Sequence, residues 1–214
     1  MNKFCILSDF DGTITKKDGL YSFIDAYAQN SWLEIEDMWQ KGKISSKECL
    51  IEEFNLIPNL SEALISDFIQ TLEIDEYFKD FYNEIYEREI DFYLVSDGID
   101  YFIDKILRRF GLGNIKVISN HGEFKGGKFR ITFPNDYPKC VNNAGTCKCK
   151  VLSNLREKYE KIIYIGDGVS DFCVAPHADI LFAKKALIDY CRQNDIKYTP
   201  FNDFRDIINK LDIL

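Results

Sequence analysis

Short apolar runs bounded by polar residues or glycine recur along the chain, and they have the length and composition of β-strands. Near-continuous apolar character of this kind is typical of strands that are buried on both faces of a sheet. Helical periodicity follows several of these runs, at Ile99–Phe110, Val151–Tyr159 and Lys185–Asn194. Strands that alternate with helices predict βαβ units and a parallel sheet, so the expected fold class is α/β. The expected strands are Lys3–Leu7, Asp91–Ser96, Ile115–Ser119, Lys161–Gly166 and Asp179–Ala183.

One interval, from Asp18 to about Glu89, breaks this alternation and carries helical patterns only. It is too long for a crossover connection and too apolar for a loop, so it predicts a helical insertion. We therefore expect a core domain built from residues 1–15 and 90–214, and a cap domain at residues 16–89. A hairpin is expected within His121–Pro134, turning at Gly126–Gly127. The helical stretches are Ser22–Gln29, Ser45–Phe54 and Ser61–Glu73, and the last two offer serine N-caps.

Composition and charge narrow the classes of partner. The chain has 214 residues, of which 46% are hydrophobic, and its formal net charge is −8. No cluster of lysine and arginine is long enough for a nucleic-acid footprint, so no nucleic-acid partner is expected. No apolar run is long enough to span a bilayer, and the first residues lack the apolar core of a signal peptide. We expect a cytoplasmic protein without a membrane partner, either a monomer or a homodimer.

Polar side chains follow three of the expected strands. Because the carboxyl ends of parallel strands meet at one edge of a sheet, these groups are expected to converge there. So many aspartates in one place would repel one another unless a cation neutralised them, and hard oxygen ligands suit Mg²⁺. The three groups are Asp9–Thr13, Ser96–Gly98 and Gly166–Asp171.

The two aspartates of the first group are expected to have different catalytic roles. Asp9, at a strand tip, is placed to attack as a carboxylate nucleophile. The chain is expected to turn at this point, which Gly12 permits, so that Asp11 can reach over and act as acid and base. Asp167 would complete the metal shell, and Asp171 would orient its neighbours. Each piece also has a structural interpretation as a turn or a helix cap, but a calcium-binding EF-hand loop is excluded because glycine comes at the fourth position rather than the sixth.

A phosphate ester carries about two negative charges, so a carboxylate nucleophile needs a fixed cation beside it. Lys148 and Lys150 lie at the expected start of a helix, where lysine is mildly unfavourable because of the helix dipole. Their position hints at an anionic partner, although a solvated helix start would also explain it.

With these residues assembled, the sequence resembles the haloacid dehalogenase (HAD) superfamily, in its phosphoserine-phosphatase-like branch. The matching motifs are Asp9–Thr13, Val95–Gly98, Lys148 and Ile165–Asp171. The resemblance implies a Rossmann-like core with an inserted cap, Mg²⁺ as cofactor, and hydrolysis of a small phosphorylated metabolite through an aspartyl-phosphate.

The resemblance also implies residue roles. Asp9 is similar to the nucleophile, Asp11 to the general acid and base, Ser96 to a phosphate-binding hydroxyl and Lys148 to the cation. The implied metal ligands are Asp9, the backbone carbonyl of Asp11, and Asp167, with Asp171 expected in the same metal-binding group. Substrate contacts are expected from Thr13, Asp18, Asp97 and Gly98.

Two subgroups are most similar. Methionine-salvage phosphatases, which act on 2-hydroxy-3-keto-5-methylthiopentenyl-1-phosphate, share the stretch Asp9–Thr15, an aspartate at the place of Asp18 and cysteines before the motif lysine. Phosphoethanolamine/phosphocholine and pyridoxal-phosphate phosphatases resemble the segments around Lys148 and Asp167. Phosphoserine phosphatases usually have a cap arginine, whereas the corresponding segment Lys47–Ile57 has Glu52 and Glu53 instead. These glutamates would suit an amine-bearing substrate if they face the site, but they could equally form a solvated helix face.

Cys140, Cys147 and Cys149 do not have a standard zinc spacing, so free thiols are expected, with an oxidation-sensitive loop as a hypothesis. Two rivals remain for the activity. The first is a phosphomutase, which would return the phosphoryl group to a sugar. The second is a non-catalytic sensor, which is disfavoured because a sensor is expected to lack the nucleophile or the acid and this sequence has both.

Overall fold

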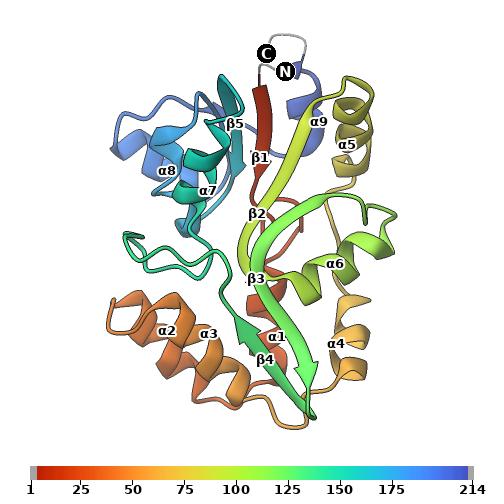
Figure 1. The fold of residues 1–214 in the computed structure, drawn as a ribbon, viewed down its shortest axis with the longest axis vertical. Coiled ribbons are helices and arrows are strands. Elements are labelled where there is room, and N and C mark those ends of the chain that lie inside the picture. The colour runs from red at the N-terminus through yellow and green to blue at the C-terminus, as the bar shows by residue number, and fades with distance from the viewer. Residues whose placement is uncertain (1–3, 212–214) are drawn as a thin grey trace.

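A seven-stranded sheet runs through the centre of the molecule in the computed structural model, which describes residues 4–211 (Figure 1). The strand order is β4-β3-β2-β1-β5-β6-β7, and all neighbours are parallel except β3 and β4. This mostly parallel sheet confirms the expected α/β class. The strands are β1 (Phe4–Ser8), β2 (Asp91–Ile99), β3 (Lys116–Lys125), β4 (Lys128–Thr132), β5 (Lys161–Gly166), β6 (Ile180–Ala183) and β7 (Thr199–Pro200).

Helices cover both faces of the sheet, so the side chains of its central strands are buried on both faces. In β1, Ile6 packs into one hydrophobic cluster and Cys5 and Leu7 pack into another on the opposite face. The first cluster includes residues of α5, α6 and α9, and the second includes residues of α7 and α8. The helices are α1 (Gly19–Tyr27), α2 (Trp32–Gln40), α3 (Ser46–Asn55), α4 (Glu62–Ile69), α5 (Phe78–Glu87), α6 (Asp100–Arg109), α7 (Lys148–Leu155), α8 (Ala186–Gln193) and α9 (Phe204–Ile208).

Two strands extend further than their apolar runs. Strand β2 continues to Ile99, so Asp97 and Gly98 belong to it rather than to a loop. The hairpin at Gly126–Gly127 is confirmed, with positive φ at both glycines. Its first strand is continuous with the run that begins at Lys116, so the two segments expected separately are one strand, β3. Pairing with β2 at one end and with β4 at the other supports this length.

The expected helical insertion between β1 and β2 consists of α1 to α5. Serines begin two of its helices as expected, because Ser45 forms a capping box with Glu48 and Ser61 caps α4. Helix α5 packs beside the sheet, where Phe78 and Phe81 contact Phe92 of β2 and Phe204 of α9. The domain boundary at residue 89 stays a prediction. None of the helices within residues 4–211 has the length and apolarity to cross a bilayer.

An aromatic cluster joins the insertion to the rest of the molecule. Phe23 of α1 is fully buried and contacts Phe54 of α3, Phe68 of α4 and Phe102 of α6. Phe54 in turn stacks on Phe129 of β4 at a centroid distance of 5.4 Å. The β3–β4 hairpin and α6 therefore contact helices α1, α3 and α4 of the insertion, next to the carboxyl ends of the parallel strands (Figure 1).

Candidate active site

The carboxyl end of β1 places Asp9 against a buried lysine. Oδ1 of Asp9 lies 2.8 Å from Nζ of Lys148, and both side chains are almost completely buried. Asp9 comes directly after the last residue of β1, and its backbone N–H donates to Ile165 of β5, so the sheet fixes its position. Among the described residues, Oδ2 of Asp9 accepts no hydrogen bond, which leaves one oxygen of a rigid carboxylate available.

Lys148 begins α7, three residues earlier than the periodicity of the sequence indicates. Besides Asp9, its ammonium contacts Oδ1 of Asp171 at 2.6 Å and Oγ of Ser170 at 2.8 Å. Burial lowers the pKa of Lys148, but the charges of Asp171 and Asp9 outweigh burial and raise it. The lysine is therefore a permanent cation. Lys150, by contrast, is exposed and lies over the ring of Tyr137.

Asp171 is fully buried and held by several donors. Its Oδ1 accepts from Lys148 and from the hydroxyl of Tyr164 at 2.6 Å, and its Oδ2 accepts the backbone N–H groups of Asp167 and Gly168. These bonds fix the turn that carries Asp167. The orienting role expected for Asp171 agrees with these contacts, whereas metal ligation by Asp171 stays a prediction.

Asp167 lies beside the turn that follows Asp9. Thr13 donates its hydroxyl to Oδ1 of Asp167 at 2.9 Å, and Lys185 places its ammonium 2.9 Å from Oδ2. Gly12 has a φ of +74°, and a Cβ there would lie 2.4 Å from Oδ2 of Asp167, so both the turn and the close approach require glycine. Thr13 thus orients Asp167 in this structure; the substrate contact expected of it stays a prediction.

Asp9, Asp167 and Asp171 offer carboxylate oxygens that lie within 4.8 Å of one another. Burial raises the pKa of Asp9 well above its usual range, the charge of Asp171 raises it further, and Lys148 only partly opposes this. A set of crowded carboxylate oxygens with excess negative charge fits a hard divalent cation. Since four donors already surround Asp171, Asp9 and Asp167 are the side chains that fit such an ion best.

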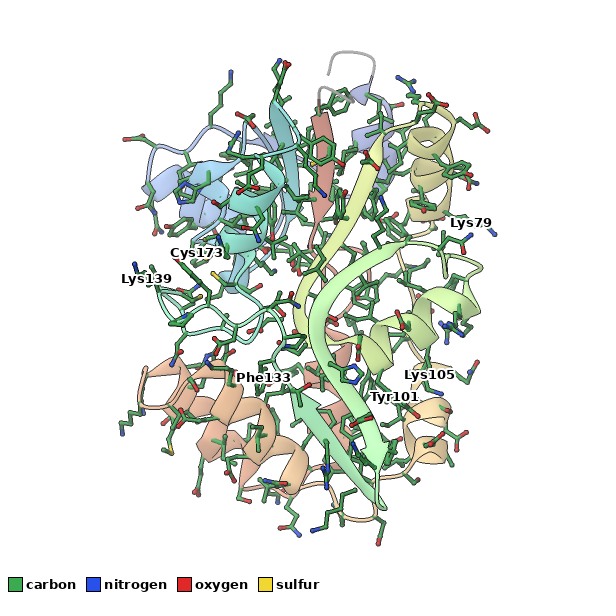
Figure 2. All side chains as sticks on the ribbon, viewed as in Figure 1. Lys79, Tyr101, Lys105, Phe133, Lys139 and Cys173 are labelled. Atoms are coloured by element: carbon green, nitrogen blue, oxygen red, sulfur yellow. The ribbon has the colours of Figure 1, made fainter. Side chains whose placement is uncertain are left out.

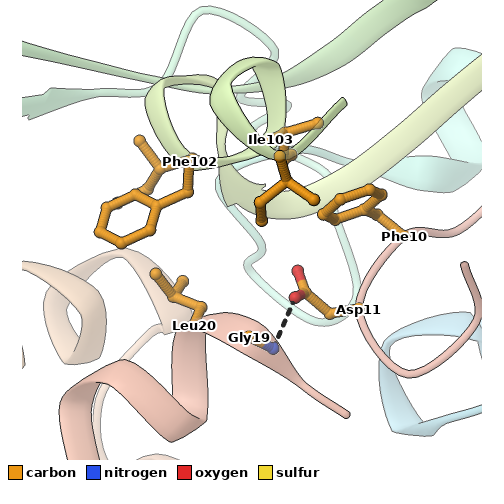
Figure 3. A pocket seen from close by; sticks show the side chains of 8 residues that line it. Phe10, Asp11, Gly19, Leu20, Phe102 and Ile103 are labelled. Carbon is orange, nitrogen blue, oxygen red and sulfur yellow. Dashed lines mark hydrogen bonds between the residues drawn. The ribbon is translucent and has the colours of Figure 1, made fainter. Parts of the chain in front are cut away.

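The carboxylate of Asp11 points away from this cluster, toward the insertion. Its Oδ1 accepts the backbone N–H of Gly19 at 2.9 Å, as Figure 3 shows. Asp11 also borders a cavity of about 10 Å³ between α1 and α6, whose other lining is mostly apolar, and a space of that size holds about one water molecule. Burial, and secondly the charge of Asp18, raise the pKa of Asp11 to about 7. Ligation of Mg²⁺ by the backbone carbonyl of Asp11, which the family resemblance implies, stays a prediction.

The end of β2 brings Ser96 and Gly98 next to Asp11. A Cβ at Gly98 would lie 3.0 Å from both Oδ2 of Asp11 and Oγ of Ser96, so glycine allows these two groups to approach. Oγ of Ser96 accepts the N–H of Gly98, and its own O–H has no acceptor among residues 4–211. The hydroxyl of Ser96 is therefore free to donate to an anion.

Asp97 points to the other side and joins three parts of the chain. Its carboxylate accepts from Ser46 of α3 at 2.7 Å, from the amide of Asn120 and from the backbone of Thr146, directly before Cys147 and α7. These contacts hold the insertion, β3 and the start of α7 together. Binding of substrate by Asp97 stays a prediction.

Acidic side chains of the insertion extend this environment. Asp18 caps α1 and is exposed, and partial loss of hydration beside the neighbouring groups, together with the charge of Asp167, raises its pKa. Glu53 of α3 is only 5% exposed, and burial, with the neighbouring charge of Glu36, raises its pKa to about 7. Glu52 is exposed. A solvated helix face is therefore wrong for Glu53 and confirmed for Glu52.

Sequence reasoning missed the two lysines that follow β6. Lys185 bridges Asp167 and the carbonyl of Gly12, and Lys184 donates to the carbonyl of Thr13 at 2.9 Å. Burial, and secondly the charge of Lys185, lower the pKa of Lys184. The rule that ligands bind beyond the carboxyl ends of parallel strands applies to β6 as well, and it would have found both residues.

Comparisons with known proteins agree with this geometry. The family model described as Putative Phosphatase matches residues 4–194. The chain is 32% identical over 208 residues to the 2-hydroxy-3-keto-5-methylthiopentenyl-1-phosphate phosphatases of Bacillus thuringiensis and Bacillus anthracis, covering 96% of this chain and 94% of each relative.

Solved structures show the same fold. A phosphoserine phosphatase with an analogue of the phospho-aspartyl intermediate superposes with a TM-score of 0.70 at 19% identity, covering 97% of this chain and 98% of the other. A HAD family hydrolase from Salmonella enterica has a TM-score of 0.73 at 18% identity, covering 95% of this chain and 69% of that one.

The family match and the Bacillus relatives define the class of this protein as a phosphatase, and its fold is that of the HAD family hydrolase and phosphoserine phosphatase structures. Within that class, the chain belongs to the Putative Phosphatase family, and it is similar to the methionine-salvage phosphatases over nearly its whole length.

Proposed function

We propose that this phosphatase is Mg²⁺-dependent, that it hydrolyses a small phosphorylated metabolite through an aspartyl-phosphate on Asp9, and that its substrate is 2-hydroxy-3-keto-5-methylthiopentenyl-1-phosphate. The observation that carries the chemistry is the contact between Asp9 and Lys148, because a fixed cation beside one oxygen of a rigid carboxylate leaves the other oxygen to attack phosphorus. Similarity to the Bacillus enzymes along 96% of the chain supports the substrate.

The residues around Asp9 have consistent roles in this reaction. Lys148 neutralises charge on the phosphoryl group, and the free hydroxyl of Ser96 binds one of its oxygens. As the bond to the leaving oxygen breaks, Asp11 donates a proton to that oxygen. Asp11 then removes a proton from the water that attacks the aspartyl-phosphate, which returns Asp9 and releases inorganic phosphate. A carboxyl group with a pKa of about 7 suits both proton transfers near neutral pH.

Mg²⁺ would be held by Asp9 and Asp167, with the backbone carbonyl of Asp11 as the ligand that the family resemblance implies. Bound there, it would neutralise the negative charge of the carboxylates and of the phosphoryl group. Thr13, Asp171 and Lys185 orient the carboxylates or their turns.

A second candidate substrate class is an amine-bearing phosphate such as phosphoethanolamine or phosphocholine, with pyridoxal phosphate as a further member of the group. The observation that favours it is the acidic side of the insertion. The charge of Asp18 reaches both Asp11 and Glu53, and Glu53 forms no ion pair with a described lysine or arginine. Negative side chains near the leaving group would favour a cationic one.

Release of inorganic phosphate from a panel of esters tests both candidates. The panel contains the methionine-salvage ester, phosphoethanolamine, phosphocholine, pyridoxal phosphate and phosphoserine, with kcat/KM as the measure. We expect the highest value for the methionine-salvage ester. A higher value for an amine-bearing ester would replace the first candidate by the second, and formation of a rearranged sugar phosphate without phosphate release would indicate a mutase.

The remaining expectations on the environment of the protein stay proposals. We expect a cytoplasmic enzyme that acts as a monomer or a homodimer, with no nucleic-acid or membrane partner. Its net charge of −8 is consistent with the absence of a nucleic-acid partner.

A further inference from the structure

The carboxylate of Asp97 accepts hydrogen bonds from three separate parts of the chain. Its Oδ2 accepts the hydroxyl of Ser46 at 2.7 Å. Its Oδ1 accepts the backbone N–H of Thr146 at 2.8 Å and the side-chain amide of Asn120 at 3.1 Å. All three donors are neutral, and hydrogen bonds from neutral donors to a carboxylate are roughly twice as strong as those between neutral groups. Asp97 is therefore the centre of a polar network that begins next to Ser96.

The start of α7 depends on this network, because the helix has no side-chain cap of its own. Its N-cap residue, Cys147, makes no side-chain cap hydrogen bond. The residue before it, Thr146, is fully buried and is held twice, through its N–H by Asp97 and through its hydroxyl by Oδ1 of Asn120 at 3.0 Å. Lys148 follows two residues later as the first residue of α7. The bond between Thr146 and Asp97 therefore helps to set where the ammonium of Lys148 lies.

The same network holds the end of β2, where Ser96 precedes Asp97. The backbone carbonyl of Asp97 accepts a further hydrogen bond from the amide of Asn120, at 2.6 Å. Asn120 is 1% exposed, so its bonds to Asp97 and its bond from Thr146 are shielded from water. The network thus joins both groups that the proposed reaction uses to bind the phosphoryl oxygens, Ser96 and Lys148.

The insertion reaches the network at the first turn of α3. Ser46 is the first residue of this helix and donates to the network, and Lys47, the next residue, forms an ion pair with Asp136 at 2.8 Å. Asp136 belongs to the segment between β4 and α7, in which Figure 2 labels Phe133 and Lys139. Two neighbouring residues of the insertion therefore contact the groups that lead into α7.

We propose that Asp97 is a positioning residue, through which contact with the insertion holds Lys148 and Ser96 in their places for catalysis. The two oxygens of a carboxylate move together, because they belong to one rigid plane. When the bond from Ser46 is lost, the carboxylate is free to rotate and its bond to Thr146 weakens. The start of α7 then loosens, and a displacement of about 1 Å in such a site costs up to about a hundredfold in rate.

The link between the insertion and α7 is tested by amide hydrogen exchange with mass spectrometry on the full chain, and this link does not depend on the proposed function. Ser46→Ala removes one hydroxyl from the insertion. We expect exchange in peptides that cover residues 146–152 to become up to about tenfold faster, the size that loss of a hydrogen bond to a charged group gives. Ser46→Thr, which keeps the hydroxyl, should exchange like the parent.

Two further variants provide the controls. Ser61→Ala removes the N-cap of α4 and so weakens another helix of the same insertion. It is expected to leave both kcat and exchange at residues 146–152 unchanged. Asp97→Ala should raise exchange there at least as much as Ser46→Ala does. Adding Ser46→Ala to Asp97→Ala should have no further effect, because both substitutions break the same link.

The effect on rate rests on the proposed phosphatase function and is measured as phosphate release from the ester panel. Ser46→Ala is expected to lower kcat about tenfold for every ester, with KM within about twofold, because the loosened groups act on the phosphoryl group that all the esters share. Ser46→Thr should recover the parent kcat. If Asp97→Ala does not fold, the comparison of Ser46→Ala with Ser46→Thr still decides the question.

Unchanged exchange at residues 146–152 in Ser46→Ala would overturn the proposal, and so would an equal increase in Ser61→Ala. Faster exchange with an unchanged kcat would show that the link has no role in catalysis. A higher KM for the amine-bearing esters alone in Asp97→Ala would make Asp97 a substrate ligand instead. If exchange responds as expected but the parent releases no phosphate from any ester, the link stands and the proposed function fails. If the parent is active and exchange does not respond, the reverse holds.

Discussion

Nζ of Lys148 lies 2.8 Å from Oδ1 of Asp9, although the two residues are far apart in the sequence. Asp9 follows the first strand and Lys148 begins the helix before β5. The contact joins a negative group that burial disfavours to a cation that its aspartate neighbours stabilise. The first two predictions concern this pair.

Asp9→Asn is expected to reduce hydrolysis of an aryl phosphate by about a thousandfold or more, because an amide cannot form the aspartyl-phosphate. The fold should survive, since asparagine keeps the volume of the side chain and Lys148 keeps Asp171 as a partner. Turnover is measured by phosphate release and folding by circular dichroism. Substantial activity in a folded variant would remove Asp9 from the role of nucleophile.

Lys148→Met should abolish activity and also destabilise the protein. Removing the cation leaves Asp9 and Asp171 buried without it, and the loss of one partner of a buried ion pair costs about 3–5 kcal/mol in the free energy of unfolding. Urea denaturation gives this value. The matched control is Lys150→Met, two residues on, where the side chain is exposed, and it should change neither property. Equal effects at both positions would contradict the assignment.

Removal of divalent metal by EDTA is expected to stop phosphate release, and added Mg²⁺ should restore it. Binding of the ion only to the folded state stabilises that state, by about 2.7 kcal/mol at a hundred times the Kd. The readout is the midpoint of thermal unfolding with and without Mg²⁺.

Asp167→Asn should lose most of this thermal shift, because the substitution removes one of the carboxylates that fit the ion. Asp37→Asn, on the exposed face of α2, should keep it. An undiminished shift in Asp167→Asn would mean that the ion binds elsewhere.

The stability of the protein should fall as pH rises from about 4.5 to about 7, in part because of Glu53. The pKa of Glu53 is raised in the folded state to about 7 from an ordinary value of 4.5, so the folded protein holds this proton where the unfolded chain has released it. Below this window Glu53 is protonated in both states and costs nothing. Above it the buried charge costs about 3 kcal/mol, which is the free-energy equivalent of this pKa shift.

Glu53→Gln removes this charge, so the variant should be more stable than the parent at pH 8 and similar to it at pH 4.5. Thermal unfolding across pH measures the difference between the two proteins, in which other titrating groups cancel. Glu52→Gln is the matched control, because Glu52 is exposed, and it should follow the parent. A parallel pH dependence in the parent and Glu53→Gln would show that Glu53 is not the group responsible.

Much of the core fold could be predicted because buried strands leave a direct pattern. Strands such as Lys161–Gly166 read as continuous apolar runs, since helices cover both faces of the sheet. The length of β3 could not be predicted in this way. Beyond Ser119, polar residues of β3 are held in the strand by pairing with β4. The hydrophobic pattern of one strand does not show which other strand it pairs with.

For the site, the sequence by itself determined which residues are available: the aspartates after β1 and β5, the serine and glycine of β2 and the lysine before β5. Parallel strands must end at a common edge, so convergence of these residues followed from the order of elements alone. Only the tertiary structure decided how each side chain is used. In the folded chain, Thr13 donates to Asp167, and several donors surround Asp171. Glu53 is buried whereas Glu52 is exposed. Lys185 donates to the carbonyl of Gly12. The physical reason is that local sequence restricts the backbone, whereas the partner, burial and charge state of a side chain depend on segments that meet it only after folding.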